Sequence, residues 1–163
     1  MKHWVLAVAA MSFSLMSFSR GAPAGVQVEG SWARATFQEA SNGAAFVTLT
    51  DTSGHGDILV AASSPIASLT ELHVHKTVSG ITQMRPVSVL PIPAGGSITL
   101  QPGAEHVMLI GLRQPLREGV VIPLHLVFAT SNVVETTVPV RDVGATGPPD
   151  HHTGHDEPTR ANH

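Results

Sequence analysis

The 163-residue sequence contains no cysteine and few charged residues, and both shortages restrict what the protein can do. Without cysteine the chain cannot form disulfides, thiolate nucleophiles, iron–sulfur clusters, cysteine-type zinc sites or the histidine–cysteine ligand set of blue copper. It also has no cysteine to carry an N-terminal lipid. Charged residues make up 13% of the chain, and Lys2 and Lys76 are the only lysines, so we predict no basic surface for nucleic acid or for an anionic membrane.

What the sequence does contain is enough apolar material for one folded domain and an excess of histidine. Hydrophobic residues make up 42% of the chain, which argues against wholesale disorder. A length of 163 residues is typical of a single domain. Ten histidines in a chain this poor in charge call for a chemical explanation.

Residues 1–24 have the pattern of a secretory signal peptide. Lys2 precedes an apolar stretch from Trp4 to Phe18, and Ala22-Pro23-Ala24 resembles a cleavage site. The alternative, a membrane anchor, fits less well because a span needs about 20 apolar residues, and four serines lie between Trp4 and Arg20. We therefore predict export to the periplasm, with cleavage after Ala24. The exported chain would retain only two of its five methionines, Met84 and Met108, so methionine is not its general core filler.

Between residues 26 and 140 the sequence alternates short apolar, β-branched runs with turn residues such as Ser79-Gly80. Ile122, Leu124, Leu126 and Phe128 show the period of two that is typical of a half-buried strand. Many short strands at this spacing predict an all-β protein, a β-sandwich or barrel with Greek-key links and a largely aliphatic core. The expected strands are 26–35, 44–50, 58–62, 69–76, 81–85, 97–101, 106–112, 121–129 and 132–140.

The last twenty residues differ in composition from the rest of the chain. Residues 144–163 contain almost no large apolar side chain and cannot bury enough surface to fold. We therefore predict three parts: a signal peptide over 1–24, a β-sandwich domain over 25–143 and a disordered, histidine-rich tail over 144–163.

Two pairs of residues suggest a metal site in the domain. His106 and Met108 are two apart on a predicted strand, so both side chains project from one face, and Val107 and Leu109 project from the other. Thioethers select Cu(I), and imidazole accepts several transition metals. Taken alone, His106 and Met108 fit a surface histidine and a packing methionine better than a metal site.

A second histidine pair and the other retained methionine strengthen the metal hypothesis. His73 and His75 share one face of a predicted strand, and a hairpin around Ser79-Gly80 would bring Met84 near His73. Two imidazoles and two thioethers would make a four-ligand Cu(I) set without cysteine. Whether these side chains meet in space depends on strand pairing.

The spacing of these residues resembles the signature of the PCu(A)C-type periplasmic copper chaperones. Ten residues separate His73 from Met84, 21 separate Met84 from His106, and one separates His106 from Met108. The resemblance covers about residues 26–140 and includes SWARAT at 31–36, ELH at 71–73, MRPV at 84–87, IPAGG at 92–96, GL at 111–112 and PLREG at 115–119.

The resemblance implies a cupredoxin-like antiparallel β-sandwich that binds Cu(I) at an exposed site through His73, Met84, His106 and Met108. It further implies delivery of copper toward cytochrome c oxidase assembly, at the dinuclear copper centre of subunit II, together with Sco-type thioredoxin-like proteins. One position departs from the family, because many relatives have a methionine where this chain has His75. We interpret His75 as a solvated strand residue rather than an auxiliary ligand.

Outside the predicted signal peptide, the remaining histidines divide into a tail group and two isolated residues. Tail residues His151, His152, His155 and His163 accompany Asp150, Asp156 and Glu157, a nitrogen and oxygen set that suits Cu(II). We predict auxiliary Cu(II) capture by the tail, the alternative being an incidental polar segment. His55 and His125 fit structural or surface roles better than ligand roles.

No enzymatic activity is predicted for this chain. It has no His-Glu-x-x-His, no phosphate-binding loop and no Gly-x-Ser-x-Gly, and its carboxylates are scattered. Besides the Cu(I) carrier, two hypotheses remain open: a copper buffer or scavenger that binds through its tail, and a noncatalytic β-sandwich of adhesion or assembly. Electron transfer fits less well, because a blue-copper site needs a cysteine.

Overall fold

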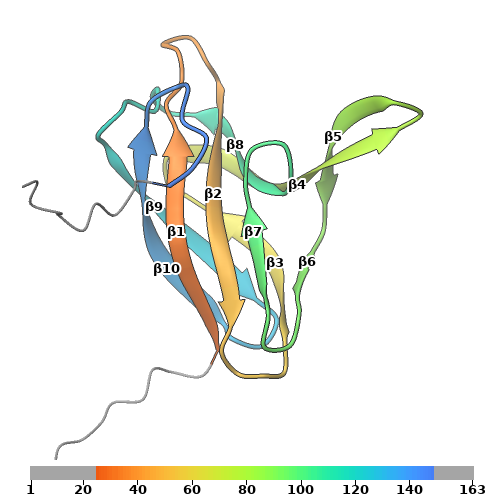
Figure 1. Ribbon diagram of the computed structural model, residues 1–163. Coiled ribbons are helices and arrows are strands. Elements are labelled where there is room, and N and C mark those ends of the chain that lie inside the picture. Colours follow the sequence, from red (N-terminus) through yellow and green to blue (C-terminus); the bar gives the residue numbers. More distant parts are fainter. Residues whose placement is uncertain (1–24, 149–163) are drawn as a thin grey trace, which may run out of the picture.

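A computed structural model describes residues 25–148, which form ten strands and no helix (Figure 1). This part of the chain therefore contains no helix that could cross a membrane. Every strand expected from the sequence is present, and β6 is an additional one, a three-residue strand centred on Pro91. The strands are β1 (Val26–Arg34), β2 (Asn42–Asp51), β3 (Asp57–Ser63), β4 (Ala67–Val78), β5 (Ile81–Val87), β6 (Leu90–Ile92), β7 (Ser97–Leu100), β8 (His106–Leu112), β9 (Val121–Phe128) and β10 (Val133–Arg141).

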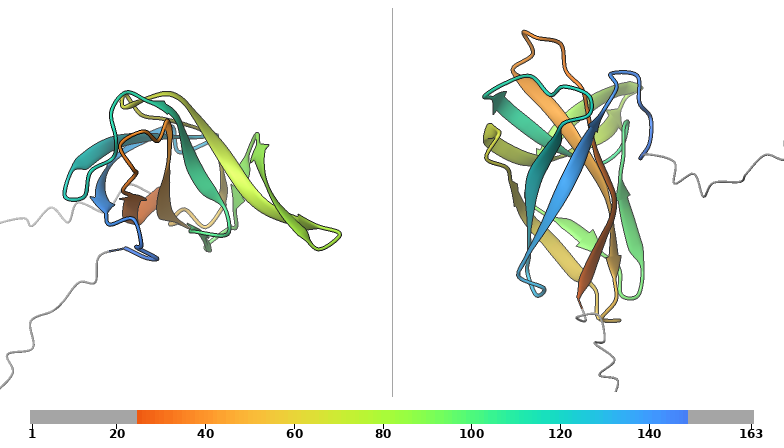
Figure 2. Two further views of the ribbon diagram at one scale, coloured as in Figure 1. Left: turned by 90° about the horizontal axis from the view of Figure 1, so that it is seen from above. Right: turned by 90° about the vertical axis from the view of Figure 1, so that its left-hand side faces the viewer.

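The strands form two layers that meet where β1 pairs with β10. One layer has the order β5-β4-β8-β2-β1, with β7 also paired to β2, and the other has the order β10-β9-β3-β6 (Figure 2). Within residues 25–148 the pairing of β1 with β10 is parallel, and the other strand pairings are antiparallel. The predicted all-β, cupredoxin-like β-sandwich is confirmed, with this one parallel pair as a difference.

The core between the layers is aliphatic, as the scarcity of aromatic residues predicts. In β9, the four residues that alternate in sequence, from Ile122 to Phe128, are all buried. Fully burying one Leu or Val side chain stabilises a fold by about 1.5–3 kcal/mol. The largest fully buried side chains come from both layers: Val47, Leu49, Leu59, Leu100, Val107, Leu109, Leu124, Leu126 and Val138.

The described domain continues five residues beyond the boundary predicted at residue 143. Ala145 is buried against Trp32 and Phe46, whose ring centres are 4.5 Å apart. The Arg34 guanidinium donates two hydrogen bonds to the Ala145 carbonyl, at 3.2 and 2.7 Å. Residues 144–148 contain no large apolar side chain that could anchor them. They are attached to the domain by hydrogen bonds from arginine side chains to their backbone carbonyls. The rest of the predicted tail and the predicted signal peptide lie outside the described residues.

Asp51 joins two loops at the end of the sandwich that lies away from the hairpin of β4 and β5. One carboxylate oxygen accepts hydrogen bonds from the Ser53 backbone (2.9 Å) and hydroxyl (2.6 Å), and the other from the Gly56 and Gly95 backbones, at 2.9 and 2.8 Å. The Ser53 hydroxyl, followed by the Gly95 and Gly56 N–H groups, holds the pKa of this carboxyl well below its usual range. The ionised form of Asp51 therefore stabilises the fold.

We expect Asp51→Asn to lower the melting temperature at neutral pH and to lower it less in acid. The folded-state pKa lies below the unfolded value of about 3.9, so the stabilisation is present above that value and is lost as the pH falls further. Thermal unfolding of both proteins between pH 7 and pH 2.5 measures the difference between their melting temperatures. The substitution of an exposed residue, Glu39→Gln, is the control. A difference in melting temperature that is the same at all pH values would contradict this account of Asp51.

Candidate metal centre

The hairpin of β4 and β5 places Met84 directly opposite His75. Ser79 and Gly80 form a two-residue turn with φ angles of 51° and 79°, as the turns typical of tight hairpins require. The turn pairs Val78 with Ile81, and the same register pairs His75 with Met84. The predicted hairpin is confirmed, but the partner of His73 on β5 is Pro86. In Figure 1 the hairpin projects from the body of the sandwich.

On its other edge β4 pairs with β8, which brings the remaining predicted residues to the same face. His73 lies opposite His106, and Glu71 lies opposite Met108. Directly opposed residues of neighbouring strands project from the same face of a sheet. Three neighbouring strands, β5, β4 and β8, therefore present all four predicted ligands on one face.

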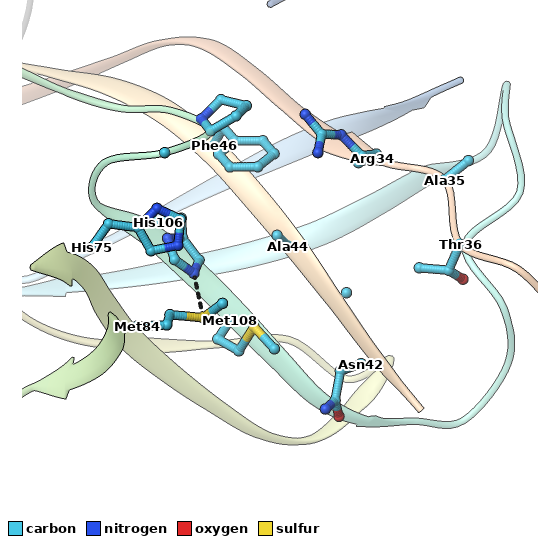
Figure 3. Close-up of a pocket in the computed structure, with 13 residues that line it drawn as sticks. Arg34, Ala35, Thr36, Asn42, Ala44, Phe46, His75, Met84, His106 and Met108 are labelled. Atoms are coloured by element: carbon cyan, nitrogen blue, oxygen red, sulfur yellow. Dashed lines mark hydrogen bonds between the residues drawn. The ribbon is translucent and has the colours of Figure 1, made fainter. Parts of the chain in front are cut away.

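The side chains of His106 and Met84, two of the four predicted ligands, are in direct contact. His106 Nε2 lies 3.3 Å from the Met84 sulfur (Figure 3). His106 Nδ1 lies 3.1 Å from the Ala104 carbonyl oxygen. The carbonyl can only accept, so Nδ1 carries the proton of the neutral ring and Nε2 carries a lone pair. The Nε2 lone pair and the thioether lone pairs then face each other without a proton between them.

This contact has the dimensions of two ligands on one ion. Two ligands of a tetrahedral ion, with metal–nitrogen and metal–sulfur bonds of about 2.0 and 2.3 Å, lie roughly 3.5 Å apart. The 3.3 Å between His106 Nε2 and the Met84 sulfur is close to that separation. An imidazole nitrogen and a thioether are both metal ligands, and the thioether selects soft ions.

Burial keeps the His106 ring in the form that a metal needs. The side chain is 4% exposed, and burial lowers its pKa, helped by the neighbouring His75 and His73, against the Ala104 hydrogen bond and the charge of Glu105. A lowered histidine pKa means that the neutral ring predominates at neutral pH. His106 therefore offers an unprotonated Nε2.

A pocket of about 300 Å³ lies beside this contact and contains three of the four predicted residues. Met84, His106 and Met108 line it, together with Ala44 and Phe46 (Figure 3). Met84 is 48% exposed, on the outermost strand of the layer. The site is consequently open on the side of the hairpin and closed on the side of the core.

His75 also lines this pocket, which the sequence analysis did not expect. Its ring stands edge-on to that of His106, with 5.2 Å between ring centres. The ring of His75 is only partly exposed and lies against the site, so it is less solvated than the sequence analysis expected. A signal was available: a two-residue turn at Ser79-Gly80 sets the register, and counting back from the turn places His75 opposite Met84.

His73 lies beside His106 but is not among the residues that line the pocket. The ring centres of His73 and His106 are 5.8 Å apart, and His73 Nε2 donates to a Glu71 carboxylate oxygen at 2.8 Å. In the neutral ring this leaves Nδ1 as a lone pair, and that atom is buried with no hydrogen-bond partner among the described residues. Orientation of a histidine by a carboxylate is typical of metal ligands, so the donor chemistry of His73 fits a ligand role.

Nitrogen and oxygen donors alone do not form a preassembled site in residues 25–148. No three His, Asp or Glu side chains of this part of the chain converge closely enough to hold a metal ion. A metal bound by these side chains as they stand would therefore need the thioethers. His125 on β9 and His55 in the loop after β2 do not line this pocket, and the tail histidines lie outside the described residues.

Comparison with known proteins identifies relatives of the whole described domain. The sequence model of the family "Putative lipoprotein LpqE-like" matches residues 26–140. "Putative lipoprotein Lxx21020" of Leifsonia xyli subsp. xyli is 38% identical over 119 residues, which cover 72% of this chain and 70% of that protein.

Two solved structures extend the comparison. CuI-DR1885 from Deinococcus radiodurans is 30% identical, with a TM-score of 0.59 over 77% of this chain and 83% of that one. The copper-bound PCuAC domain of PmoF2 has a TM-score of 0.62 over 72% of this chain and 92% of that domain, at 18% identity. The predicted resemblance to the PCu(A)C-type family is confirmed.

The hydrogen bond to Ala104 predicts which nitrogen of His106 carries the proton. In the metal-free protein at neutral pH we expect the tautomer with hydrogen on Nδ1, because the carbonyl oxygen can only accept. Long-range ¹H–¹⁵N NMR spectra of the imidazole rings distinguish the two tautomers, and His106→Gln assigns the signal. A proton on Nε2 would mean that the contact with Met84 is an ordinary N–H···S hydrogen bond.

Proposed function

Because the chain belongs to the LpqE-like family and shares its fold with PCuAC domains, we propose that it is an exported carrier of Cu(I). The observation that supports this most strongly is the 3.3 Å approach of His106 Nε2 and the Met84 sulfur. Two electron-pair donors with no proton between them repel each other until a cation joins them. Copper is the cargo of this site rather than a catalytic cofactor.

We assign four ligands to the bound ion: His73, Met84, His106 and Met108. Met84 and Met108 supply the soft donors that favour Cu(I) over divalent ions. His106 supplies Nε2, and His73 would supply the unpartnered Nδ1 while Glu71 orients its ring. Two similar structures are the copper-bound PCuAC domain of PmoF2 and the Cu(I) form of DR1885, which supports the same cargo for this chain.

The arrangement of the site favours a carrier over a permanent copper protein. The Met84 ligand lies half exposed on the outermost strand, where another protein's ligands can reach the ion without the sandwich opening. Ligand exchange at an open edge needs only one donor at a time to leave. We propose delivery toward cytochrome c oxidase assembly, at the copper centre of subunit II, in cooperation with a Sco-type thioredoxin-like protein.

Export is proposed from the predicted signal peptide over residues 1–24, with the periplasm as destination. The family and one relative carry lipoprotein in their names, which supports a place in the cell envelope. This chain has no cysteine in its 163 residues to which a lipid could be attached. We therefore propose that it works there without a lipid on any of these residues.

The methionine ligands can be tested without disturbing the core. We expect Met84→Leu and Met108→Leu each to weaken Cu(I) binding in an anaerobic chelator competition, because leucine keeps the volume but has no sulfur donor. The metal-free melting temperature should barely change, since such swaps usually cost less than about 1.5 kcal/mol. Oxidation of both methionines to sulfoxides should reproduce the loss of Cu(I) affinity.

If the double leucine variant binds Cu(I) as tightly as the parent, both methionines are packing residues and the carrier proposal is wrong. If the parent itself binds no copper, a noncatalytic role in adhesion or assembly replaces it.

The tail histidines are tested separately, because a copper buffer acting through the tail is the second candidate. We expect serine at positions 151, 152, 155 and 163 to reduce the number of Cu(II) ions bound and to leave Cu(I) binding unchanged, because imidazole and carboxylate donors suit Cu(II). Equilibrium dialysis with each oxidation state measures both. Loss of most Cu(I) on the same substitutions would favour the buffer.

A further inference from the structure

We propose that His75 is a copper ligand and that it allows the domain site to hold Cu(II) as well as Cu(I). The inference rests on the proposed function, because it concerns the same pocket. It concerns one residue of this chain, at the position where the sequence departs from the methionine of many relatives, and it assigns a second oxidation state of the metal to the site.

The position of His75 is the first argument. His75 lies directly opposite Met84 across the hairpin, and its ring lines the pocket together with His106 and both methionines (Figure 3). Two imidazoles bound to one ion through bonds of about 2.0 Å have ring centres roughly 5 Å apart. The rings of His75 and His106 are 5.2 Å apart, so the spacing of the two rings suits a shared ion.

The second argument is that the other two histidines of the site each have a hydrogen-bonded ring nitrogen. Glu71 holds His73, and the Ala104 carbonyl holds His106. Within residues 25–148 no hydrogen bond to the His75 ring is formed, although the ring is only partly exposed. Since nothing holds His75 in one orientation, it can turn either toward the pocket or toward solvent.

Donor chemistry supplies the third argument. Met84 and Met108 serve Cu(I), whereas Cu(II) prefers nitrogen and oxygen donors in a tetragonal arrangement. With His75 the site contains three imidazoles, because the ring centres of His73 and His75 lie 5.8 and 5.2 Å from that of His106. These rings do not converge in the metal-free structure, so Cu(II) binding requires rotation of His75. We therefore expect Cu(II) to bind one to one but less tightly than Cu(I).

The test uses the full exported chain in which serine replaces the four tail histidines, so that only the domain binds Cu(II). In this background we compare His75→Ala and His75→Met with the control His125→Ala, which removes a strand histidine of the other layer. Cu(II) affinity comes from chelator competition, and its nitrogen ligands come from electron paramagnetic resonance. Cu(I) affinity is measured anaerobically, and the melting temperature is recorded without metal.

We expect both His75 variants to bind Cu(II) about tenfold or more weakly, since even outer-shell changes have effects of this size on metal sites. The electron paramagnetic resonance spectrum of bound Cu(II) should show one nitrogen ligand fewer. His75→Met should keep Cu(I) affinity within about threefold of the background, because a thioether replaces an imidazole that Cu(I) does not require. The His125→Ala control should match the background in every measurement.

Three results would overturn the inference. The first is an unchanged Cu(II) affinity and spectrum in both His75 variants, and the second is a background protein that binds Cu(I) but no Cu(II). Either result leaves the proposed function standing if Met84→Leu still weakens Cu(I) binding. The third is that His75→Met loses affinity for Cu(I) and Cu(II) equally and melts at a lower temperature, which would assign His75 a structural role. A background that binds neither ion refutes the proposed function as well.

Discussion

The pairing of β4 with β5 on one edge and with β8 on the other determines where every donor atom of the site lies. Leu72 and Val107 oppose each other on the buried face of this pairing, and His73 and His106 oppose each other on the outer face. A slip of one residue would send the histidines into the core and the leucine into water. The hydrophobic effect on one face of the sheet therefore holds the metal-binding residues of the other face in register.

This division between faces separates stability from chemistry. The aliphatic core is contributed by both layers, and the donor side chains lie on the outer face of a single layer. Side chains outside the core can be exchanged at little cost in folding free energy.

The three histidines of the site differ because their ring nitrogens have different partners. Glu71 holds Nε2 of His73 and leaves Nδ1 as its donor, whereas the Ala104 carbonyl holds Nδ1 of His106 and leaves Nε2. Burial further keeps His106 neutral by lowering its pKa. His75 has neither restraint, which makes it the donor most free to follow the ion as the coordination changes.

Local sequence features were sufficient to predict most of the fold, since the alternation of apolar residues and the turn residues act over a few positions. They placed nine strands, the aliphatic core and the common face of His106 and Met108. The three-residue β6 was not predicted, because Pro91 disfavours a strand and so short a run shows no periodicity. The attachment of residues 144–148 to the domain was not predicted, because arginine hydrogen bonds rather than large apolar side chains hold them.

At the site, the sequence alone determined which residue types were available and, through the turn at Ser79-Gly80, the register that pairs His75 with Met84. Only the tertiary structure decided that His75 lines the pocket while His73 is held by Glu71. The physical reason is that the atom beside each ring nitrogen decides whether that nitrogen carries the proton or offers its lone pair to a metal. That atom is set by strand pairing and side-chain rotation.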